Sequence, residues 1–386
     1  MAGGLPVQLT SLALLAGTVL YLGVVVWLLT GIGRSRRAPG TTLPPPPVSV
    51  VVAARDEGDR IGACVRSLAG QTYGGALQIV VVDDRSGDRT GRVLAALRSD
   101  WRAAAELVLV RAPDPPLYAC PKKSALAAGI DRAEGEILLF TDADCQPPPE
   151  WVGAMVSRFD GGVGLVAGYA YPHPTAGVRQ RVLALDNLGV AALAEGSIGM
   201  EAPLACTGRS LAYRRAVYDE VGGFEAIGHL VSGDDVYFLR LVTARTGWGV
   251  RYCADEAAAV PSAPPPLHWG ALLDQKVRHA SKASRYEGGA RWLGAAVYLY
   301  HAALLAGGLL AAGGNQATFF LCCWLTRWLA DLILLARFSP RASDRFGLLL
   351  LPVVEILYIP YVLLLVPLGR AGWFRWKSGT APLSRS

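Results

Sequence analysis

Two long apolar runs, one near each end of the chain, constrain its fold more than any other feature. Residues 9–32 contain no charged side chain, and the stretch 293–368 is almost continuously apolar. A run of about 20 apolar residues is long enough to cross the hydrocarbon core of a bilayer. The residues between the runs, roughly 230, have a globular composition and are enough for one domain. The sequence therefore predicts a membrane-anchored protein with one domain outside the bilayer.

Charge and cysteine content indicate the compartment. Arg34, Arg36 and Arg37 follow the first apolar run, and such basic flanks face the cytoplasm in most membrane proteins. We therefore expect the central domain in the cytoplasm, at the cell (inner) membrane. The net charge of +6 forms no basic stripe interleaved with aromatic residues, so we expect no nucleic-acid partner. The seven cysteines lack the spacing of a zinc site, and we expect reduced, mostly buried thiols.

The pattern along the chain predicts six parts. They are an N-terminal transmembrane anchor (1–33), a proline-rich linker (34–47), a cytoplasmic α/β domain (48–265), a juxtamembrane amphipathic helix (266–290), a C-terminal transmembrane region (291–368) and a basic tail (369–386). The transmembrane region contains apolar segments near 293–313, 316–336 and 347–368. Pro352 and Pro360 interrupt the last one and basic residues flank it, so whether it spans the bilayer or is re-entrant stays open.

Two charged residues lie inside the second of these segments. Arg327 and Asp331 are spaced i, i+4 and can pair on one face of a helix. Pairing reduces the cost of about 2.5–3.5 kcal/mol for a lone charge at mid-bilayer. We interpret them as a structural ion pair.

Short apolar runs alternate with helical stretches in the central domain. The first four runs are residues 48–54, 77–84, 106–113 and 136–145. They are continuously apolar, which is typical of strands buried on both faces of a parallel sheet. The expected fold class is therefore α/β, with a mostly parallel, doubly wound sheet. Such sheets bind ligands beyond the carboxyl ends of their strands.

Asp142 and Asp144 end one of these strands, and their i, i+2 spacing places both carboxylates on one side. Their mutual repulsion requires a positive charge to offset it. A hard divalent ion, Mg²⁺ or Mn²⁺, would do so and would bridge to the diphosphate oxygens of a nucleotide substrate. The alternative is a solvated loop end.

Asp83 and Asp84 end another strand. A carboxylate at this position can accept hydrogen bonds from a base N–H or a ribose hydroxyl. The alternative is local capping of the next helix, with Ser86 or Asp88 at its amino end. Glycine-rich phosphate loops are absent from the sequence, so metal and cationic side chains are left to hold a diphosphate.

Two further groups of residues can carry chemistry. Asp234 and Asp235 precede an apolar helical run, where they can cap the helix or supply a general base that deprotonates an acceptor hydroxyl. Gln275 and Arg278 share a face of the juxtamembrane helix. The guanidinium can clamp a diphosphate leaving group while the amide orients the acceptor, or the arginine can contact lipid headgroups.

These segments together resemble a known enzyme family. Over about residues 48–285 the chain is similar to the inverting family 2 glycosyltransferases of the GT-A fold, in the membrane-attached branch related to cellulose synthases, ceramide glucosyltransferases and N-acetylglucosamine polymerases. The segments that carry the resemblance are, in order, VSVVVAARDEG, VVVDDRSGDRT, KKSALAAGI, FTDADC, CTGRSLAYRR, VGGF, SGDDVYF and QKVRH.

The resemblance implies roles for particular residues. It assigns nucleotide-sugar binding to Ala53, Arg55, Glu57, Asp83, Asp84, Lys122 and Asp142, and metal binding to Asp142 and Asp144. The catalytic residues that it implies are Asp235 as the base and Gln275 with Arg278 as a QxxRW-like element. Acceptor or secondary roles fall to Gly208, Asp234 and His279. The chain departs from the family pattern at three positions. His279 replaces the tryptophan of QxxRW, Ala127 replaces an asparagine, and Asp234 replaces a glutamate.

The implied activity is an inverting transfer of sugar from a nucleotide-diphospho-sugar, with a UDP-sugar as the expected donor. The expected acceptor is a hydroxyl of a membrane lipid, and the product carries a β-linkage. Few apolar segments follow the domain, which favours a lipid acceptor over a channel-forming polysaccharide synthase, although oligomers could build a channel. A processive synthase is therefore the second interpretation, and a non-catalytic membrane scaffold or a nucleotidyltransferase comes after it.

Overall fold

The structure is a computed structural model that describes residues 4–38, 40, 44–173, 177–264, 268–283, 288–314, 316–339 and 341–371. The chain divides into two compact units. We call Thr30–Thr175 with Asn187–Pro264 the sheet unit, and Met1–Leu29 with Ala176–Asp186 and Pro265–Ser386 the helical unit. Two helices, α1 (Gly4–Arg37) and α6 (Val178–Gly199), contribute residues to both.

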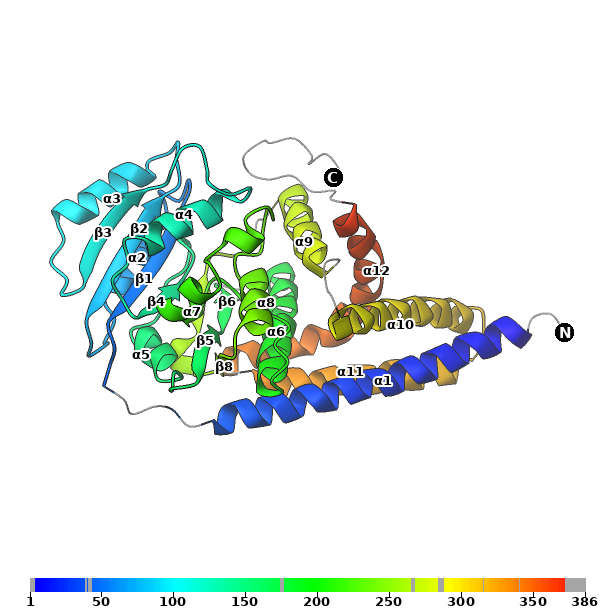
Figure 1. Ribbon diagram of the computed structural model, residues 1–386. Coiled ribbons are helices and arrows are strands. Elements are labelled where there is room, and N and C mark those ends of the chain that lie inside the picture. The colour runs from blue at the N-terminus through cyan, green and yellow to red at the C-terminus, as the bar shows by residue number, and fades with distance from the viewer. Residues whose placement is uncertain are drawn as a thin grey trace. The chain divides into compact units, whose positions relative to one another are not determined.

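A seven-stranded sheet of order β3-β2-β1-β4-β7-β5-β8 forms the centre of the sheet unit (Figure 1). Its strands are β1 (Val48–Ala54), β2 (Leu77–Asp83), β3 (Glu106–Arg111), β4 (Ile137–Phe140), β5 (Val163–Gly168), β7 (Leu211–Arg214) and β8 (Gly249–Cys253). β7 runs antiparallel to both of its neighbours, whereas the other pairs are parallel. A separate two-stranded parallel sheet consists of β6 (Ala170–Pro172) and β9 (Val260–Ser262). The predicted mostly parallel sheet is confirmed.

Helices cover both faces of this sheet. The α-helices are α2 (Ile61–Ala69), α3 (Thr90–Ser99), α4 (Pro121–Ile130), α5 (Trp151–Val156), α7 (Arg215–Glu220) and α8 (Val236–Arg245), and the 3-10 turns are η1 (Glu225–Ile227) and η2 (Glu256–Ala258). Val50 and Val52 belong to the core that includes the buried face of α2. Val51, which points the other way, lies close to Gly129 of α4. Burial on both faces explains why the sequence of β1 is continuously apolar.

The last turns of α1 pack closely on the end of α6 within the sheet unit. A Cβ atom on Gly31 would lie 1.9 Å from the carbonyl oxygen of Gly196, so the two backbones touch only because a glycine stands here. Arg36 donates two hydrogen bonds to the fully buried carboxylate of Glu195, at 3.0 and 3.1 Å. A bidentate pair with a buried acid fixes the angle between the two helices.

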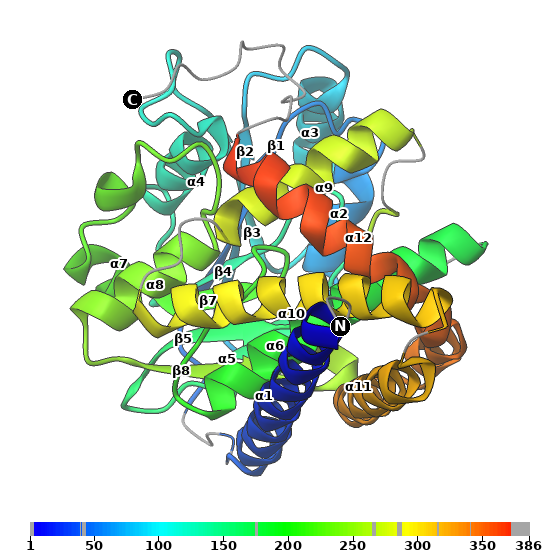
Figure 2. The ribbon, with the colours of Figure 1, turned by 90° about the vertical axis from the view of Figure 1, so that its right-hand side faces the viewer.

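The helical unit contains α9 (Trp269–Ala283), α10 (Gly288–Ala312), α11 (Ala317–Phe338), η3 (Ala342–Leu350) and α12 (Leu351–Arg370). α12 packs against α9 and α10 (Figures 1 and 2). Pro352 lies in the first turn of α12, where no backbone N–H is needed, and the helix continues through Pro360. Among the described residues five helices are long and apolar enough to cross a membrane, namely α1, α6, α10, α11 and α12. The protein is membrane-attached.

Arg327 of α11 lies closer to a glutamate of α12 than to Asp331, its predicted partner. Arg327 Nη2 lies 2.8 Å from Glu355 Oε2 of α12, whereas its Nε atom lies 3.8 Å from Asp331 Oδ2. Asp331 instead accepts a hydrogen bond of 2.5 Å from the hydroxyl of Tyr21 in α1. All three charged side chains are buried. The pair is therefore part of a cluster that joins three helices of the helical unit.

Candidate active site

The strand order brings four chain segments to one edge of the sheet. β1, β2 and β4 are parallel, so their carboxyl ends share this edge. β7 is antiparallel to β4, and the pairing of Phe140 with Leu211 places the start of β7 where β4 ends. Gly208, just before β7, therefore lies next to Asp142, just after β4. Thr141 joins the segments with a 2.9 Å hydrogen bond from its hydroxyl to the carbonyl of Arg209.

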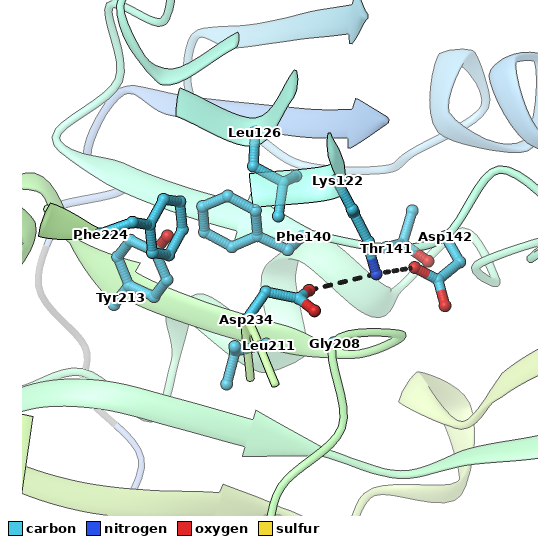
Figure 3. A pocket seen from close by; sticks show the side chains of 10 residues that line it. All are labelled: Lys122, Leu126, Phe140, Thr141, Asp142, Gly208, Leu211, Tyr213, Phe224 and Asp234. Atoms are coloured by element: carbon cyan, nitrogen blue, oxygen red, sulfur yellow. Dashed lines mark hydrogen bonds and ion pairs between the residues drawn. The ribbon is translucent and has the colours of Figure 1, made fainter. Parts of the chain in front are cut away.

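Lys122 lies between two acids at this edge (Figure 3). Its Nζ atom donates a 2.7 Å hydrogen bond to Asp142 Oδ1 and lies 3.1 Å from Asp234 Oδ2. Figure 3 shows the ammonium group between the two carboxylates, with aromatic side chains on the far side of Asp234. A small pocket here is lined by Lys122, Leu126, Phe140, Thr141, Asp142, Gly208, Leu211, Tyr213, Phe224 and Asp234. The site thus combines a charged rim with an apolar wall.

The two acids after β4 differ in their electrostatic environment. Burial raises the pKa of Asp144 to about 6, and the neighbouring charge of Asp142 adds to this rise. Burial also acts to raise the pKa of Asp142, but the charge and hydrogen bond of Lys122 outweigh it and the pKa is lowered. The same ion pairs hold the pKa of Lys122 well above its usual value in spite of its burial. Asp142 therefore carries a negative charge that Lys122 neutralises, while Asp144 is the acid of this pair with an incomplete counter-charge.

These acids fit a divalent metal that also binds a substrate. Nowhere in the described residues do three or more His, Cys, Asp or Glu side chains form a group that could hold an ion by themselves. Mg²⁺ in nucleotide enzymes is held by one or two carboxylates together with substrate phosphates and water. Two hard oxygen ligands, Asp142 and Asp144, match that donor set.

Asp235 caps α8. Its Oδ1 accepts a 2.7 Å hydrogen bond from the N–H of Val236, and its Oδ2 accepts one of 3.3 Å from the N–H of Gly208. Gly233 has a φ of 79°, in the region that favours glycine, and so turns the chain just before the two acids. The capping alternative is therefore observed, and the carboxylate is at the same time fixed next to the pocket by the segment before β7.

The loops after β1 and β2 are joined by hydrogen bonds. Asp56 accepts one of 2.8 Å from the N–H of Gly87, and the N–H of Gly58 donates one of 2.9 Å to Asp88. Asp88 also accepts from the N–H of Thr90 over 2.8 Å. Asp88 thus binds the first N–H of α3, as the alternative with Asp88 at the amino end of this helix predicts.

Asp83 and Asp84 lie at the end of β2 as predicted. Asp83 is half-buried and accepts a 3.1 Å hydrogen bond from the N–H of Ser86. Asp84 is buried and pairs with Arg85. The other residues expected to bind the nucleotide lie at or just after the end of β1. Ala53 pairs with Val82 across the sheet, and the exposed Arg55 and half-buried Glu57 follow β1.

The QxxRH element belongs to α9 in the helical unit. Gln275 is half-buried, and the side chains of Arg278 and His279 lie outside the described residues. The neighbouring Lys276 forms an ion pair with Asp186 of α6. Whether this element meets the acids of the sheet unit stays a prediction.

Two residues of the sheet unit that support the site, Lys123 and Arg209, were not predicted from the sequence. Lys123 is fully buried and donates to the carbonyl oxygens of Ile227 and Leu230. Arg209 accepts at its carbonyl the hydrogen bond from Thr141, just after β4. The signal for Arg209 was its place in the CTGRS segment, next to the predicted Gly208. For Lys123 no local signal exists, because its partners are about 100 residues away.

Comparison with known proteins identifies this arrangement. The family model "Glycosyl transferase family 2" matches residues 49–222, which include the strand ends and all the acids up to Asp144. The chain carries a family 2 glycosyltransferase domain. The predicted family, its GT-A fold and the glycosyltransferase class are thereby confirmed.

Individual relatives extend this comparison. "Glycosyltransferase AglE" of Haloferax volcanii is 28% identical over 237 residues, which are 60% of this chain and 71% of that protein. An "Undecaprenyl-phosphate 4-deoxy-4-formamido-L-arabinose transferase" of Edwardsiella ictaluri is 31% identical over 144 residues, 36% of this chain and 42% of that protein. The chain thus matches less than half the length of the latter relative.

A solved structure shows the same fold. It is the "Mannosyltransferase PcManGT from Pyrobaculum calidifontis in complex with GDP-Man and Mn2+", with a TM-score of 0.59 and 21% identity. The match covers 91% of this chain and 99% of that one.

Proposed function

We propose that this chain transfers a sugar from a nucleotide-diphospho-sugar, with UDP as the first candidate nucleotide, to a hydroxyl of a membrane lipid, forming a β-linkage. The observation that carries the proposal is the position of Lys122 between Asp142 and Asp234 at the carboxyl edge of a family 2 glycosyltransferase sheet. A non-catalytic scaffold would have no use for this costly group of partly buried charges.

The donor half of the site is the edge formed by β1, β2 and β4. Asp83, Asp84 and the segment with Ala53, Arg55 and Glu57 are proposed to contact the nucleoside, because they lie at the carboxyl ends of β1 and β2, on the same edge of the sheet as the end of β4. Asp142 and Asp144 would hold Mg²⁺ or Mn²⁺, as their oxygen donor set suggests. When bound, the metal would offset negative charge on the departing diphosphate. The Mn²⁺ and GDP-Man of the mannosyltransferase with this fold support that arrangement.

Asp235 is proposed as the general base. Two backbone N–H groups hold its carboxylate beside the pocket, so it needs little reorganisation when a hydroxyl arrives. The deprotonated oxygen attacks the anomeric carbon from the face opposite the diphosphate, the C–O bond to the diphosphate breaks, and the configuration inverts. Gln275 and Arg278 are proposed to reach the acceptor and the leaving group, with Gly208, Asp234 and His279 in secondary roles.

A lipid acceptor is supported by the membrane-attached helices and by the relatives. Several relatives are named for transfer to undecaprenyl phosphate, a membrane lipid. The second candidate is a processive synthase. It is tested as well, because an N-acetylglucosaminyltransferase of Mesorhizobium japonicum is 28% identical over 164 residues. We further propose that residues 48–265 form the catalytic domain and that it faces the cytoplasm at the inner membrane. Arg34, Arg36 and Arg37 lie in the last turn of α1, at the end that leads into this domain, and basic ends of membrane helices usually face the cytoplasm.

A donor and product screen tests the proposal. The purified full chain in native lipid extract is incubated with a panel of UDP- and GDP-sugars, and the lipid fraction is analysed by mass spectrometry. One sugar added to a lipid is the expected result, and it should vanish in Asp142→Asn but persist in Asp160→Asn, whose carboxylate pairs with Arg251 elsewhere in the sheet unit. A polymer ladder would favour the synthase. Reaction only with a nucleoside triphosphate would show a nucleotidyltransferase instead.

A further inference from the structure

Arg209 is held in place by neutral side chains. Its Nη2 donates a 2.6 Å hydrogen bond to Asn187 Oδ1, its Nη1 donates one of 2.8 Å to Ser262 Oγ, and its Nε donates one of 3.3 Å to Thr207 Oγ1. These partners come from α6, β9 and the segment before β7, all within the sheet unit. Three anchors on separate segments fix the plane of the guanidinium.

Among the described residues, no carboxylate is in direct contact with the charge of Arg209. Within the part of the chain that the structure describes, no Asp or Glu forms a salt bridge with it, although other arginines of the sheet unit pair with acids in this way. Those pairs are Arg36 with Glu195, Arg158 with Asp255, Arg214 with Glu136 and Arg251 with Asp160. An arginine that evolution had placed for packing alone would gain by the same pairing. Arg209 therefore keeps a positive charge available for a ligand.

The guanidinium also keeps donors available. It carries five N–H groups in a planar fork, and three of them are used by the anchors. One N–H remains on each terminal nitrogen, and two such groups match the bidentate geometry of a phosphate. Arg209 is half-buried, so a ligand can reach it while water screens it less than at an exposed site.

The position of Arg209 indicates which anion it would meet. The segment before β7 lies at the end of β4, and the hydroxyl of Thr141 binds the Arg209 carbonyl. Ser262, which binds the Arg209 guanidinium, is followed by Ala263, whose N–H donates a 3.0 Å hydrogen bond to the carbonyl of Asp144. This is the place where the proposed function puts the donor diphosphate.

We propose that Arg209 binds a phosphate group of the substrates, and that Thr207, Asn187 and Ser262 are positioning residues that aim its guanidinium. The inference rests on the proposed function. The phosphate belongs either to the donor diphosphate or to a lipid acceptor that carries a phosphate, and binding measurements can separate these sources.

The first experiment measures binding to the solubilised full chain by calorimetric titration. UDP and GDP, each with Mn²⁺, probe the donor phosphate, and farnesyl phosphate probes the lipid phosphate. Arg209→Gln should weaken one of these ligands by about 10- to 100-fold, because a bidentate charged contact is lost. Arg158→Gln is the matched control, since Arg158 pairs with Asp255 through both carboxylate oxygens, and it should bind all three as the wild type does.

A second variant separates ligand binding from a structural role. Asn187→Asp places a carboxylate on the Arg209 guanidinium, which strengthens the anchor but neutralises the charge. A structural arginine would tolerate this change with unaltered ligand binding, whereas the proposal expects a loss comparable to that of Arg209→Gln. Asn187 also donates to the Ala170 carbonyl, so thermal unfolding must first show that the variant is folded. Arg209→Lys, which keeps the charge without the fork, should lose only part of the affinity.

The outcomes are distinct. Weaker UDP or GDP binding supports the inference and assigns the donor phosphate, and weaker farnesyl phosphate binding supports it and assigns the lipid phosphate. Unchanged binding of every ligand in folded Arg209→Gln overturns the inference and leaves the proposed function intact. A wild-type chain that binds neither nucleotide overturns both.

Discussion

The ammonium group of Lys123 is fully buried and lies 2.7 Å from the carbonyl oxygen of Ile227. A second hydrogen bond, of 2.9 Å, goes to the carbonyl of Leu230. The loop that these bonds fasten leads directly to Asp234 and Asp235. The two adjacent lysines of α4 thus have different roles. Lys122 contacts Asp142 and Asp234, whereas Lys123 binds the loop that precedes Asp234 and Asp235.

Lys123→Met should loosen this loop. The carbonyl of Leu230 loses the ammonium donor, and the carbonyl of Ile227 keeps the N–H of Leu230 but loses the lysine. Loss of a donor to a buried carbonyl costs about 1–3 kcal/mol. We expect a lower melting temperature and faster amide hydrogen exchange over residues 225–235, with reduced transfer. Arg98→Met, on the exposed face of α3, is the control and should change neither. Unchanged exchange over the loop would show that the aromatic packing around Phe224 holds it without the lysine.

Lys122→Met should greatly slow transfer while the chain remains folded. The methionine keeps the length of the side chain but removes the charge shared by Asp142 and Asp234, so the two carboxylates lose their common partner. Removing one electrostatic contact of this kind costs on the order of 10²–10³ in rate. Single-turnover measurements with the identified donor would check it. A variant that transfers sugar within tenfold of the wild-type rate would exclude Lys122 from the active site.

The sequence could predict the part of this site that depends on strand order alone. Asp83 and Asp142 end continuously apolar strands, and parallel strands place their ends together, so their proximity follows from local pattern. The arrangement around Arg209 could not be predicted, because it depends on β7 being antiparallel between β4 and β5. Nothing in the short LAYR strand signals its direction.

The same limit applies to side chains whose partners are remote in sequence. Helical spacing predicts a pair of Arg327 with Asp331, yet Glu355 of another helix is closer to Arg327. The i, i+4 rule describes one helix, whereas packing between helices decides which acid a buried arginine meets. Lys123, with carbonyl partners about 100 residues away, is the same case in the sheet unit.

Asp235→Asn and Asp234→Asn should separate the base from its neighbour. Asparagine at 235 can still accept the N–H of Val236 and so preserve the cap, but it cannot take a proton. We expect Asp235→Asn to abolish transfer while nucleotide binding stays within a few-fold of wild type. Asp234→Asn removes one partner of Lys122 and should lower the rate less. Full turnover in Asp235→Asn would remove it from the base role, and the reverse order of the two variants would move that role to Asp234.

The buried thiols of the sheet unit should resist alkylation in the native state. Cys64, Cys120, Cys145 and Cys253 are free and buried, as the prediction of reduced thiols requires. Burial raises the pKa of each, to about 12 for Cys253, so little thiolate exists at neutral pH. Mass spectrometry after N-ethylmaleimide treatment should find these four unmodified, and modified once the protein is denatured. Native modification of any of them would show that its surroundings open readily.

Arg327→Leu should strongly destabilise the helical unit. The variant leaves the carboxylates of Asp331 and Glu355 buried together without their cation, and removing one partner of a buried ion pair costs about 3–5 kcal/mol. Thermal unfolding in lipid nanodiscs should therefore occur at a lower temperature than for the wild type. Arg337→Leu, at the exposed end of α11, is the matched control and should unfold like the wild type. Replacing Arg327, Asp331 and Glu355 together by leucine should recover most of the loss, because no uncompensated charge then remains. If the triple variant is as unstable as Arg327→Leu, the cluster stabilises the unit through its hydrogen bonds, including that from Tyr21, rather than through charge balance.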